Sequence, residues 1–178
     1  MLDTMRLEIR LIEAKDLEFA RVLHNERSTL NMLTDPFHVS REEQLEWFNN
    51  LSKSRISRRY AIIEKESGTF CGIIRIDRID MVNKNAEIGA DISPDYRNRG
   101  YAFEAYTEVI QYLFHHLGLH RLQLLTRSNN SPAIALYKKL GFIEEGVLRE
   151  ALFRDNQYSN LILMSLLSAD WKQNNPRD

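Results

Sequence analysis

The stretch Arg97-Asn98-Arg99-Gly100-Tyr101-Ala102 joins a predicted strand ending near Ser93 to the longest predicted helix, residues 100–117. The N-terminus of a helix presents unpaired N–H groups and a partial positive charge, so it attracts anions. Gly100 and Ala102 allow a ligand to approach the backbone closely, and Arg97 and Arg99 add cationic side chains. The stretch therefore predicts a site where successive backbone amides hold a diphosphate. The alternative is an arginine-containing turn whose charges are only solvated.

The pattern of apolar residues around this stretch divides the chain into strands and helices. Strand-like runs occupy residues 7–12, 59–64, 70–79, 85–93, 122–126, 142–148 and 158–167. A turn through Gly68 joins two of these runs as a hairpin, and another turn falls at Asp155-Asn156. Helical patterns begin near residues 14, 40, 100 and 131, the second of them at a capping box formed by Ser40 and Glu43.

This order of elements predicts a single α/β domain of the α+β kind over residues 1–170, followed by a polar C-terminal tail at 171–178. We expect a mixed, mostly antiparallel sheet of about seven strands flanked by about four helices. A doubly wound dinucleotide-binding sheet is disfavoured, because strictly alternating strand and helix units are absent. With 178 residues and 43% apolar side chains, the chain can bury a core without disulfides or a metal.

Composition also excludes several kinds of partner. Lys and Arg number 24 against 25 Asp and Glu, a net charge of −1, so no global field attracts nucleic acid or an anionic membrane. The single cysteine, Cys71, lies in an apolar run and is expected to be a buried, inert thiol. His115, His116 and His120 form no ligand pattern, so no metal is expected. Because no signal-peptide or membrane-spanning pattern is present, we expect a cytoplasmic location.

Two motifs give the chain a resemblance to a known family. Arg97-x-x-Gly100-x-Ala102 resembles the Gln/Arg-x-x-Gly-x-Gly/Ala pyrophosphate loop of the GCN5-related N-acetyltransferases, the GNAT family. Further along, Asn130-x-x-Ala133-x-x-Leu136-Tyr137-Lys138-Lys139-Leu140-Gly141-Phe142 resembles that family's Asn-x-x-Ser/Ala-x-x-Leu-Tyr-x-x-x-Gly-Phe segment. The resemblance covers almost the whole chain, and it is closest in character to the branches that acetylate ribosomal proteins and spermidine.

For the fold, the resemblance implies that the strands at 85–93 and 122–126 splay apart and admit the pantetheine arm of acetyl-CoA. The exposed N–H and C=O groups of such an edge need partners, and the amides of pantetheine can supply them. Acetyl-CoA is thereby implied as the co-substrate, with no metal. The residues expected to bind it are Ile88, Ile92, Ser93, Arg97, Asn98, Arg99, Gly100, Tyr101, Ala102 and Asn130.

The resemblance also implies two catalytic side chains. Tyr137 matches the tyrosine that protonates the departing CoA thiolate, and Glu87 matches a strand glutamate that removes a proton from the amine through a water. The alternative for Tyr137 is a ring that only packs beneath the sheet. The alternative for Glu87 is a solvated or paired carboxylate, with Asp91 on the same strand face as the second candidate base.

Together these features imply an acetyl-CoA-dependent N-acetyltransferase that acts directly on a primary amine, expected to be the N-terminal amine of a protein or peptide. A polyamine or an amino sugar is the alternative acceptor, and a CoA-binding module without catalysis is the alternative from another class. Residues 25–38 are expected to wall the acceptor site, where Glu26 and Asp35 attract a cationic amine unless they are simply solvated. We also expect a homodimer that pairs through residues 142–167.

Overall fold

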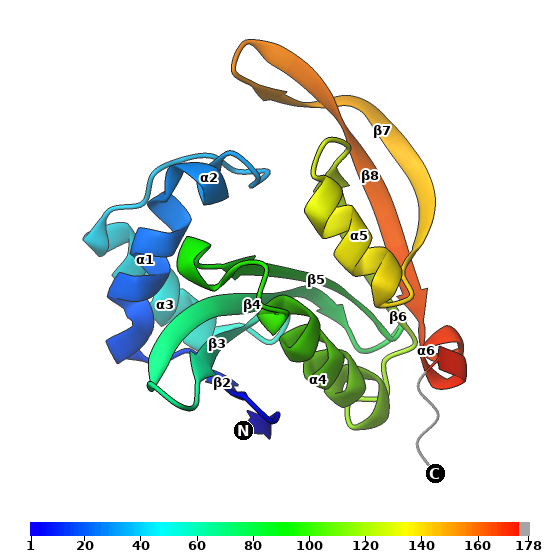
Figure 1. Cartoon of the computed structure of the whole chain (residues 1–178), viewed down its shortest axis with the longest axis horizontal. Coiled ribbons are helices and arrows are strands. Elements are labelled where there is room, and N and C mark those ends of the chain that lie inside the picture. The colour runs from blue at the N-terminus through cyan, green and yellow to red at the C-terminus, as the bar shows by residue number, and fades with distance from the viewer. Residues whose placement is uncertain (175–178) are drawn as a thin grey trace.

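One mixed sheet with helices on both faces forms the centre of the molecule in the computed structural model, which describes residues 1–174 (Figure 1). The strands are β1 (Leu2–Asp3), β2 (Leu7–Leu11), β3 (Arg58–Glu64), β4 (Thr69–Asp80), β5 (Asn85–Ile92), β6 (Arg121–Arg127), β7 (Ile143–Arg154) and β8 (Gln157–Leu167). The α-helices are α1 (Leu17–Asn25), α2 (Arg27–Leu30), α3 (Arg41–Lys53), α4 (Tyr101–His115), α5 (Ser131–Lys139) and α6 (Ser168–Asn174). Two 3₁₀ turns, η1 (Ala14–Asp16) and η2 (Pro94–Tyr96), precede α1 and α4.

The sheet order is β1-β2-β3-β4-β5-β6-β8-β7, and β5 and β6 are its parallel pair. This confirms the predicted mixed, mostly antiparallel sheet. Within residues 1–174 there are eight strands and six α-helices, where about seven and about four were expected. β1 has two residues and α2 has four, so neither is long enough to leave a periodic pattern in the sequence.

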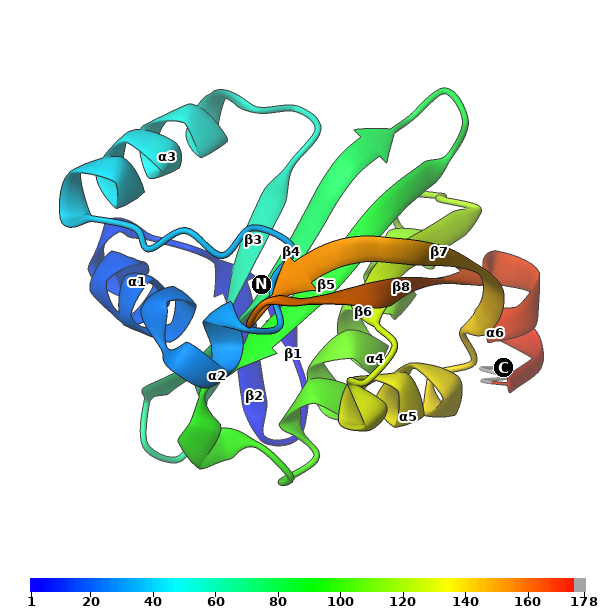
Figure 2. The same cartoon turned by 90° about the horizontal axis from the view of Figure 1, so that it is seen from above.

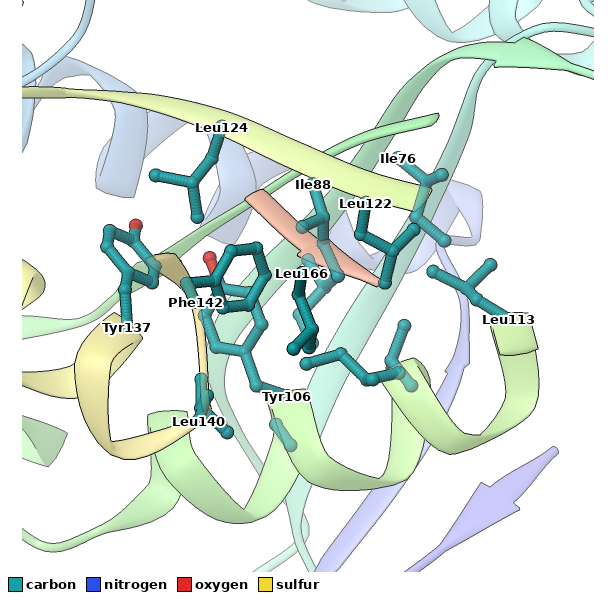
Figure 3. Packing of buried hydrophobic residues seen from close by; sticks show 14 of the residues in the cluster. Ile76, Ile88, Tyr106, Leu113, Leu122, Leu124, Tyr137, Leu140, Phe142 and Leu166 are labelled. Carbon is teal, nitrogen blue, oxygen red and sulfur yellow. The ribbon is translucent and has the colours of Figure 1, made fainter. Parts of the chain in front are cut away.

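Two apolar clusters lie on opposite faces of the sheet. The larger packs Tyr106 and Leu113 of α4 against strand residues such as Ile76 and Ile88 (Figure 3). The smaller lies beneath α1 and α3 and consists of Ile12, Ala20, Leu23, Ala61, Ile63, Phe70 and Ile73. Successive residues of a strand point to opposite faces. Alternate residues of β4 and β5 therefore face away from α4, toward the side that carries α1 to α3.

The sequence signal for the start of α3 holds in the structure. The Ser40 hydroxyl accepts a hydrogen bond from the Glu43 amide at 3.2 Å, and the Glu43 carboxylate accepts one from the Ser40 amide at 2.8 Å. The predicted capping box is thus confirmed as the start of α3.

None of the helices in residues 1–174 is long and apolar enough to cross a membrane.

The expected tail from residue 171 onward is wrong where the structure describes it. Residues 168–174 form α6, and Trp171 is 2% exposed within the larger core cluster. The Trp171 Nε1–H donates to the Gln111 side-chain oxygen on α4 at 3.0 Å. The folded domain therefore extends to at least residue 174, because one tryptophan in a polar segment docks the segment on the core. Residues 175–178 lie outside the described part of the chain.

Candidate active site

β5 and β6 pair in parallel only through the first three residues of each strand and then separate (Figure 2). Three residue pairs join them, the last between Glu87 and Gln123. β5 nevertheless runs on to Ile92, and β6 runs on to Arg127. The splay expected of strands 85–93 and 122–126 is confirmed. Beyond Glu87, the edge of β5 that faces β6 is open to an extended ligand that adds as a surrogate strand.

The loop between β5 and α4 presents free backbone donors. Asn98 and Gly100 have left-handed backbone conformations, with φ of 60° and 81°, and α4 begins directly afterwards at Tyr101. Within residues 1–174, the amides of Asn98, Arg99, Gly100, Tyr101 and Ala102 donate no hydrogen bond. Residues 98 to 100 are exposed. Adjacent free amides at a helix N-terminus suit a diphosphate, so the loop fits the ligand that the sequence implied.

Arg6, which the sequence did not single out, holds this loop in place. Its guanidinium donates to the Arg99 carbonyl at 3.0 Å, pairs with Glu104 at 2.6 Å and lies 4.6 Å above the Tyr101 ring. The Tyr101 hydroxyl in turn donates to the Glu64 carboxylate. These contacts order the loop through side chains and leave its amides free. No local pattern could reveal Arg6, because it lies 93 residues before Arg99.

The Arg97 side chain, expected to add positive charge beside the loop amides, is engaged by other parts of the fold. Its guanidinium donates to the Ile92 carbonyl at 2.9 Å, to the Ser28 hydroxyl at 2.6 Å and to the Thr29 hydroxyl at 2.8 Å. Its backbone N–H donates to the Pro94 carbonyl. Arg97 therefore ties the loop to α2, which only the tertiary fold brings near. The Arg99 side chain is exposed and lies 5.2 Å from the Tyr96 ring centre.

Tyr137 lies on α5 and is 8% exposed, among the rings of Tyr106 and Phe142 (Figure 3). Burial raises the pKa of Tyr137, and Tyr106 and the positive charge of Arg75 partly oppose that rise. The phenol therefore carries its proton at neutral pH. Asn130 is the N-cap of α5, and its side-chain oxygen accepts a hydrogen bond from the Ala133 amide at 3.4 Å.

Glu87 lies at the point where β5 and β6 part. Its carboxylate accepts a hydrogen bond from Arg78 at 2.7 Å and one from the Gln123 side chain at 3.4 Å. The Arg78 side chain is 76% exposed, so this ion pair is close to solvent. The paired carboxylate that the sequence analysis left as an alternative is thus present, beside the open strand edge.

Asp91 follows on the same face of β5 and faces Arg75 of β4. The Arg75 Nη1 and Asp91 Oδ2 atoms are 3.5 Å apart. Gly89 stands directly opposite Arg75 in the antiparallel register. A Cβ atom at Gly89 would lie 3.0 Å from the Arg75 Nη2 atom, so the absent side chain makes room for the guanidinium. Sequence reasoning missed Arg75, because its place beside Asp91 depends on strand register.

The segment expected to wall the acceptor site is anchored by arginines from distant strands. Arg127 of β6 donates to the Asn31 carbonyl at 2.7 Å. Arg154 of β7 donates to the carbonyls of Leu33 and Thr34, each at 2.9 Å, which joins this segment to the end of the β7–β8 hairpin (Figure 2). These bonds fix the backbone of the segment relative to β6 and β7.

Glu26 is engaged within the same segment and is not a free carboxylate. Hydrogen bonds from the Ser28 hydroxyl and from the Thr29 amide and hydroxyl lower the pKa of Glu26 to about 2, against the opposing effect of burial. The Arg97 guanidinium lies 3.7 Å from it. Its predicted attraction for a cationic amine is therefore largely offset.

Within residues 1–174 no group of three or more His, Cys, Asp or Glu side chains is placed to hold a metal ion. Cys71 is buried as predicted, and burial raises the pKa of its thiol to about 11.

An open strand pair, a helix N-terminus with free amides and a buried tyrosine are the features expected of a CoA-dependent acyltransferase. The GNAT acetyltransferase domain model matches residues 6–143, and the chain belongs to this family. It is an N-acetyltransferase that uses acetyl-CoA as co-substrate. The exposed loop amides and the open edge of β5 fit the diphosphate and the pantetheine amides of that molecule.

Comparisons with individual proteins agree over nearly the full length. The chain is 27% identical to spermidine N(1)-acetyltransferase of Vibrio cholerae, with 93% of this chain and 95% of that protein aligned. It is 31% identical to the uncharacterized N-acetyltransferase p20 of Bacillus licheniformis, over 94% and 96% of the two chains. The crystal structure of the Vibrio cholerae spermidine N-acetyltransferase with CoA and spermine has a TM-score of 0.89 at 27% identity, and covers 94% of this chain and 99% of that one.

Proposed function

We propose that the chain transfers an acetyl group directly to a primary amine that approaches from the face of the sheet carrying α1 to α3. The observation that carries this proposal is the separation of β5 and β6 after the Glu87–Gln123 pair, which leaves the rest of the β5 edge open. The amides of residues 98–102 hold the diphosphate, and the open edge of β5 from Ile88 hydrogen-bonds the pantetheine arm. Acetyl-CoA supplies the activated acetyl thioester.

Tyr137 is the proposed general acid. Burial raises its pKa, so the phenol retains a proton that it can give to the departing thiolate. Asn130 lies at the first turn of the same helix and is proposed to contact the pantetheine end, in addition to capping α5.

Glu87 is the proposed general base, acting through a water on the ammonium form of the acceptor. Its ion pair with Arg78 is close to solvent, so exchange of that partner for a water costs little. Asp91, two pleats along the same face, is the second candidate.

Two classes of acceptor remain in competition. The named relatives that act on spermidine favour a polyamine over the N-terminal amine expected from the sequence. One observation in this chain favours an N-terminal amine or a free amino acid, namely the arginine that neutralises Asp91. We find no feature of residues 1–174 that favours an amino sugar.

The test is thiol release from acetyl-CoA against a panel of peptides, amino acids, polyamines and amino-sugar nucleotides, with calorimetric titration of CoA in parallel. Release that requires an amine supports the transferase. Tight CoA binding without release with any amine would support the binding module that lacks catalysis.

A homodimer through the last two strands is also proposed. β7 is the outermost strand at its end of the sheet, and it exposes the apolar side chains of Ile143, Val147, Leu148 and Phe153. An exposed apolar edge strand is a template for pairing with another chain. Light scattering should report twice the monomer mass, and a Val147→Lys variant should shift to monomer. A wild-type monomer at working concentration would contradict the proposal.

The cytoplasmic location stays a prediction from sequence.

A further inference from the structure

We propose that Arg75 and Asp91 form a two-part recognition site for an acceptor that carries an oxygen group next to its amine. The Asp91 carboxylate holds the amine, and the Arg75 guanidinium holds a carbonyl or carboxylate oxygen on the neighbouring carbon. The acceptor class is therefore an α-amino acid or the N-terminus of a peptide. This inference rests on the proposed function, because it assigns the acceptor of that same site.

The Arg75 guanidinium has N–H donors that no residue of the described chain uses. On the same part of the sheet, Arg59 donates to Asp77 at 2.8 Å and Arg78 donates to Glu87 at 2.7 Å. Arg75 differs from both, because it stands 3.5 Å from its carboxylate partner and donates no hydrogen bond to any residue of the described chain. An arginine presents five N–H donors in a planar fork that suits carboxylate and carbonyl oxygens. Arg75 thus offers donors that a ligand can use.

Gly89 shapes the place where those donors lie. It stands opposite Arg75 in the β4–β5 register and two residues beyond Glu87, the last residue of β5 that pairs with β6. A Cβ atom there would lie 3.0 Å from Arg75 Nη2 and 3.3 Å from Nε, so the guanidinium lies against the bare β5 backbone. The Arg75 side chain is 33% exposed. It is accessible beside the open strand edge, where the acetyl group must be presented.

The charge of Arg75 also acts on the proposed general acid. This positive charge lowers the pKa of Tyr137 and of Tyr106, against the stronger effect of burial on both phenols.

The spacing of the pair matches an α-amino carbonyl group. In such a group the nitrogen and the carbonyl oxygen are roughly 3 Å apart, as standard bond lengths require. The Arg75 Nη1 and Asp91 Oδ2 atoms are 3.5 Å apart. A polyamine has no oxygen for Arg75 and would bring a further cation toward it. Asp77 and Glu87 already have arginine partners, so neither offers a free carboxylate to the further amines of a polyamine.

The experiment measures kcat and KM with four acceptors, namely trialanine, free alanine, propylamine and spermidine, for the wild type and for Arg75→Gln. The wild type should have higher kcat/KM for trialanine or alanine than for propylamine or spermidine. Arg75→Gln should raise KM for the oxygen-bearing acceptor about 10- to 100-fold, the range for a hydrogen bond to a charged group. KM for propylamine and Kd for CoA should change little.

Arg59→Gln is the matched control, because Arg59 stands directly opposite Arg75 on β3 and pairs with Asp77. It should leave the preference among acceptors unchanged. Arg75→Lys keeps the positive charge but lacks the planar set of N–H donors. Its KM for the oxygen-bearing acceptor should lie between those of the wild type and Arg75→Gln. The trialanine and alanine arms distinguish a peptide carbonyl from a free carboxylate.

Three outcomes would overturn the inference. A wild-type preference for spermidine over both alanine compounds contradicts it and leaves the transferase intact. An equal loss with all four acceptors in a folded Arg75→Gln variant gives Arg75 a structural role only. No acetylation of any amine, with CoA still bound, contradicts the proposed function itself.

Discussion

Tyr137 on α5 meets Tyr106 on α4 edge-on, with ring centroids 5.8 Å apart and ring planes at 87°. Both rings are buried at the junction of the two helices and the sheet (Figure 3). Burial raises the pKa of both phenols, that of Tyr106 well above its usual value. The contact fixes the Tyr137 ring, because an edge-on aromatic pair has a defined geometry. A positioned and protonated phenol is what a general acid requires.

Replacing Tyr137 by phenylalanine should lower kcat by about 100-fold, the lower end of the range for loss of a general acid. Kd for acetyl-CoA should stay the same, because the ring and its packing are kept. Steady-state kinetics and calorimetry measure the two quantities. Tyr112→Phe, half-buried near the C-terminal end of α4 and stacked on His116, is the control that should retain wild-type turnover. Unchanged kcat in Tyr137→Phe would remove the proposed role.

Replacing Glu87 by glutamine should remove the acidic limb of the pH profile of kcat/KM. A general base acts only when deprotonated, so the wild-type rate falls at low pH and the variant rate is low and flat there. An Arg78→Gln variant keeps the carboxylate and should retain the limb. If the limb persists in Glu87→Gln and disappears in Asp91→Asn, then Asp91 is the base.

Replacing Gly100 by alanine should weaken CoA binding and also lower stability. Its φ of 81° is strained for any residue with a Cβ, which costs about 1 kcal/mol, and the new Cβ would lie 3.4 Å from Arg6. Gly118→Ala is the matched control, because Gly118 has a φ of 64° and open space around it. Both variants should lose similar stability in urea unfolding. A similar rise in the Kd for CoA in both would contradict a role for the loop.

Replacing Asp16 by asparagine should destabilise the fold by about 3 kcal/mol at pH 7, the low end for breaking a buried ion pair. Asp16 is 3% exposed, and its two oxygens accept hydrogen bonds from Arg10 at 2.7 and 2.9 Å. Although burial opposes the effect, these bonds and that of the Glu13 amide lower the pKa of Asp16.

The sign of the pH dependence follows from that lowered pKa. The stabilisation by Asp16 is fully present above the unfolded pKa of about 3.8 and is lost as pH falls through the lower folded pKa. The difference between wild type and Asp16→Asn should therefore shrink below about pH 4. Glu18→Gln, at an exposed ion pair with Arg21, should change stability little at either pH. A constant difference between pH 7 and pH 3 would contradict this account.

Much of the fold was predictable because its signals are local. The alternation of residues 85–92, the Ser40 and Glu43 capping box, and the turns at Gly68 and at Asp155-Asn156 each act within a few residues. β1 and α2 escaped prediction because two and four residues carry no period. The burial of Trp171 was not predicted, because a single apolar residue in a polar segment forms no pattern that indicates packing on the core.

The sequence by itself determined the order of the longer elements, the loop that caps α4 and the two motifs that point to a CoA-dependent transferase. Only the tertiary structure decided which charges meet, as with Arg97 on Ser28 and Thr29, 69 and 68 residues away, and Arg75 beside Asp91 across Gly89. The physical reason is the distance along the chain over which each kind of interaction acts. Helix caps, turns and apolar periodicity are short-range backbone effects, whereas ion pairs depend on strand register and on where β5 leaves β6, which emerge only when the whole sheet packs.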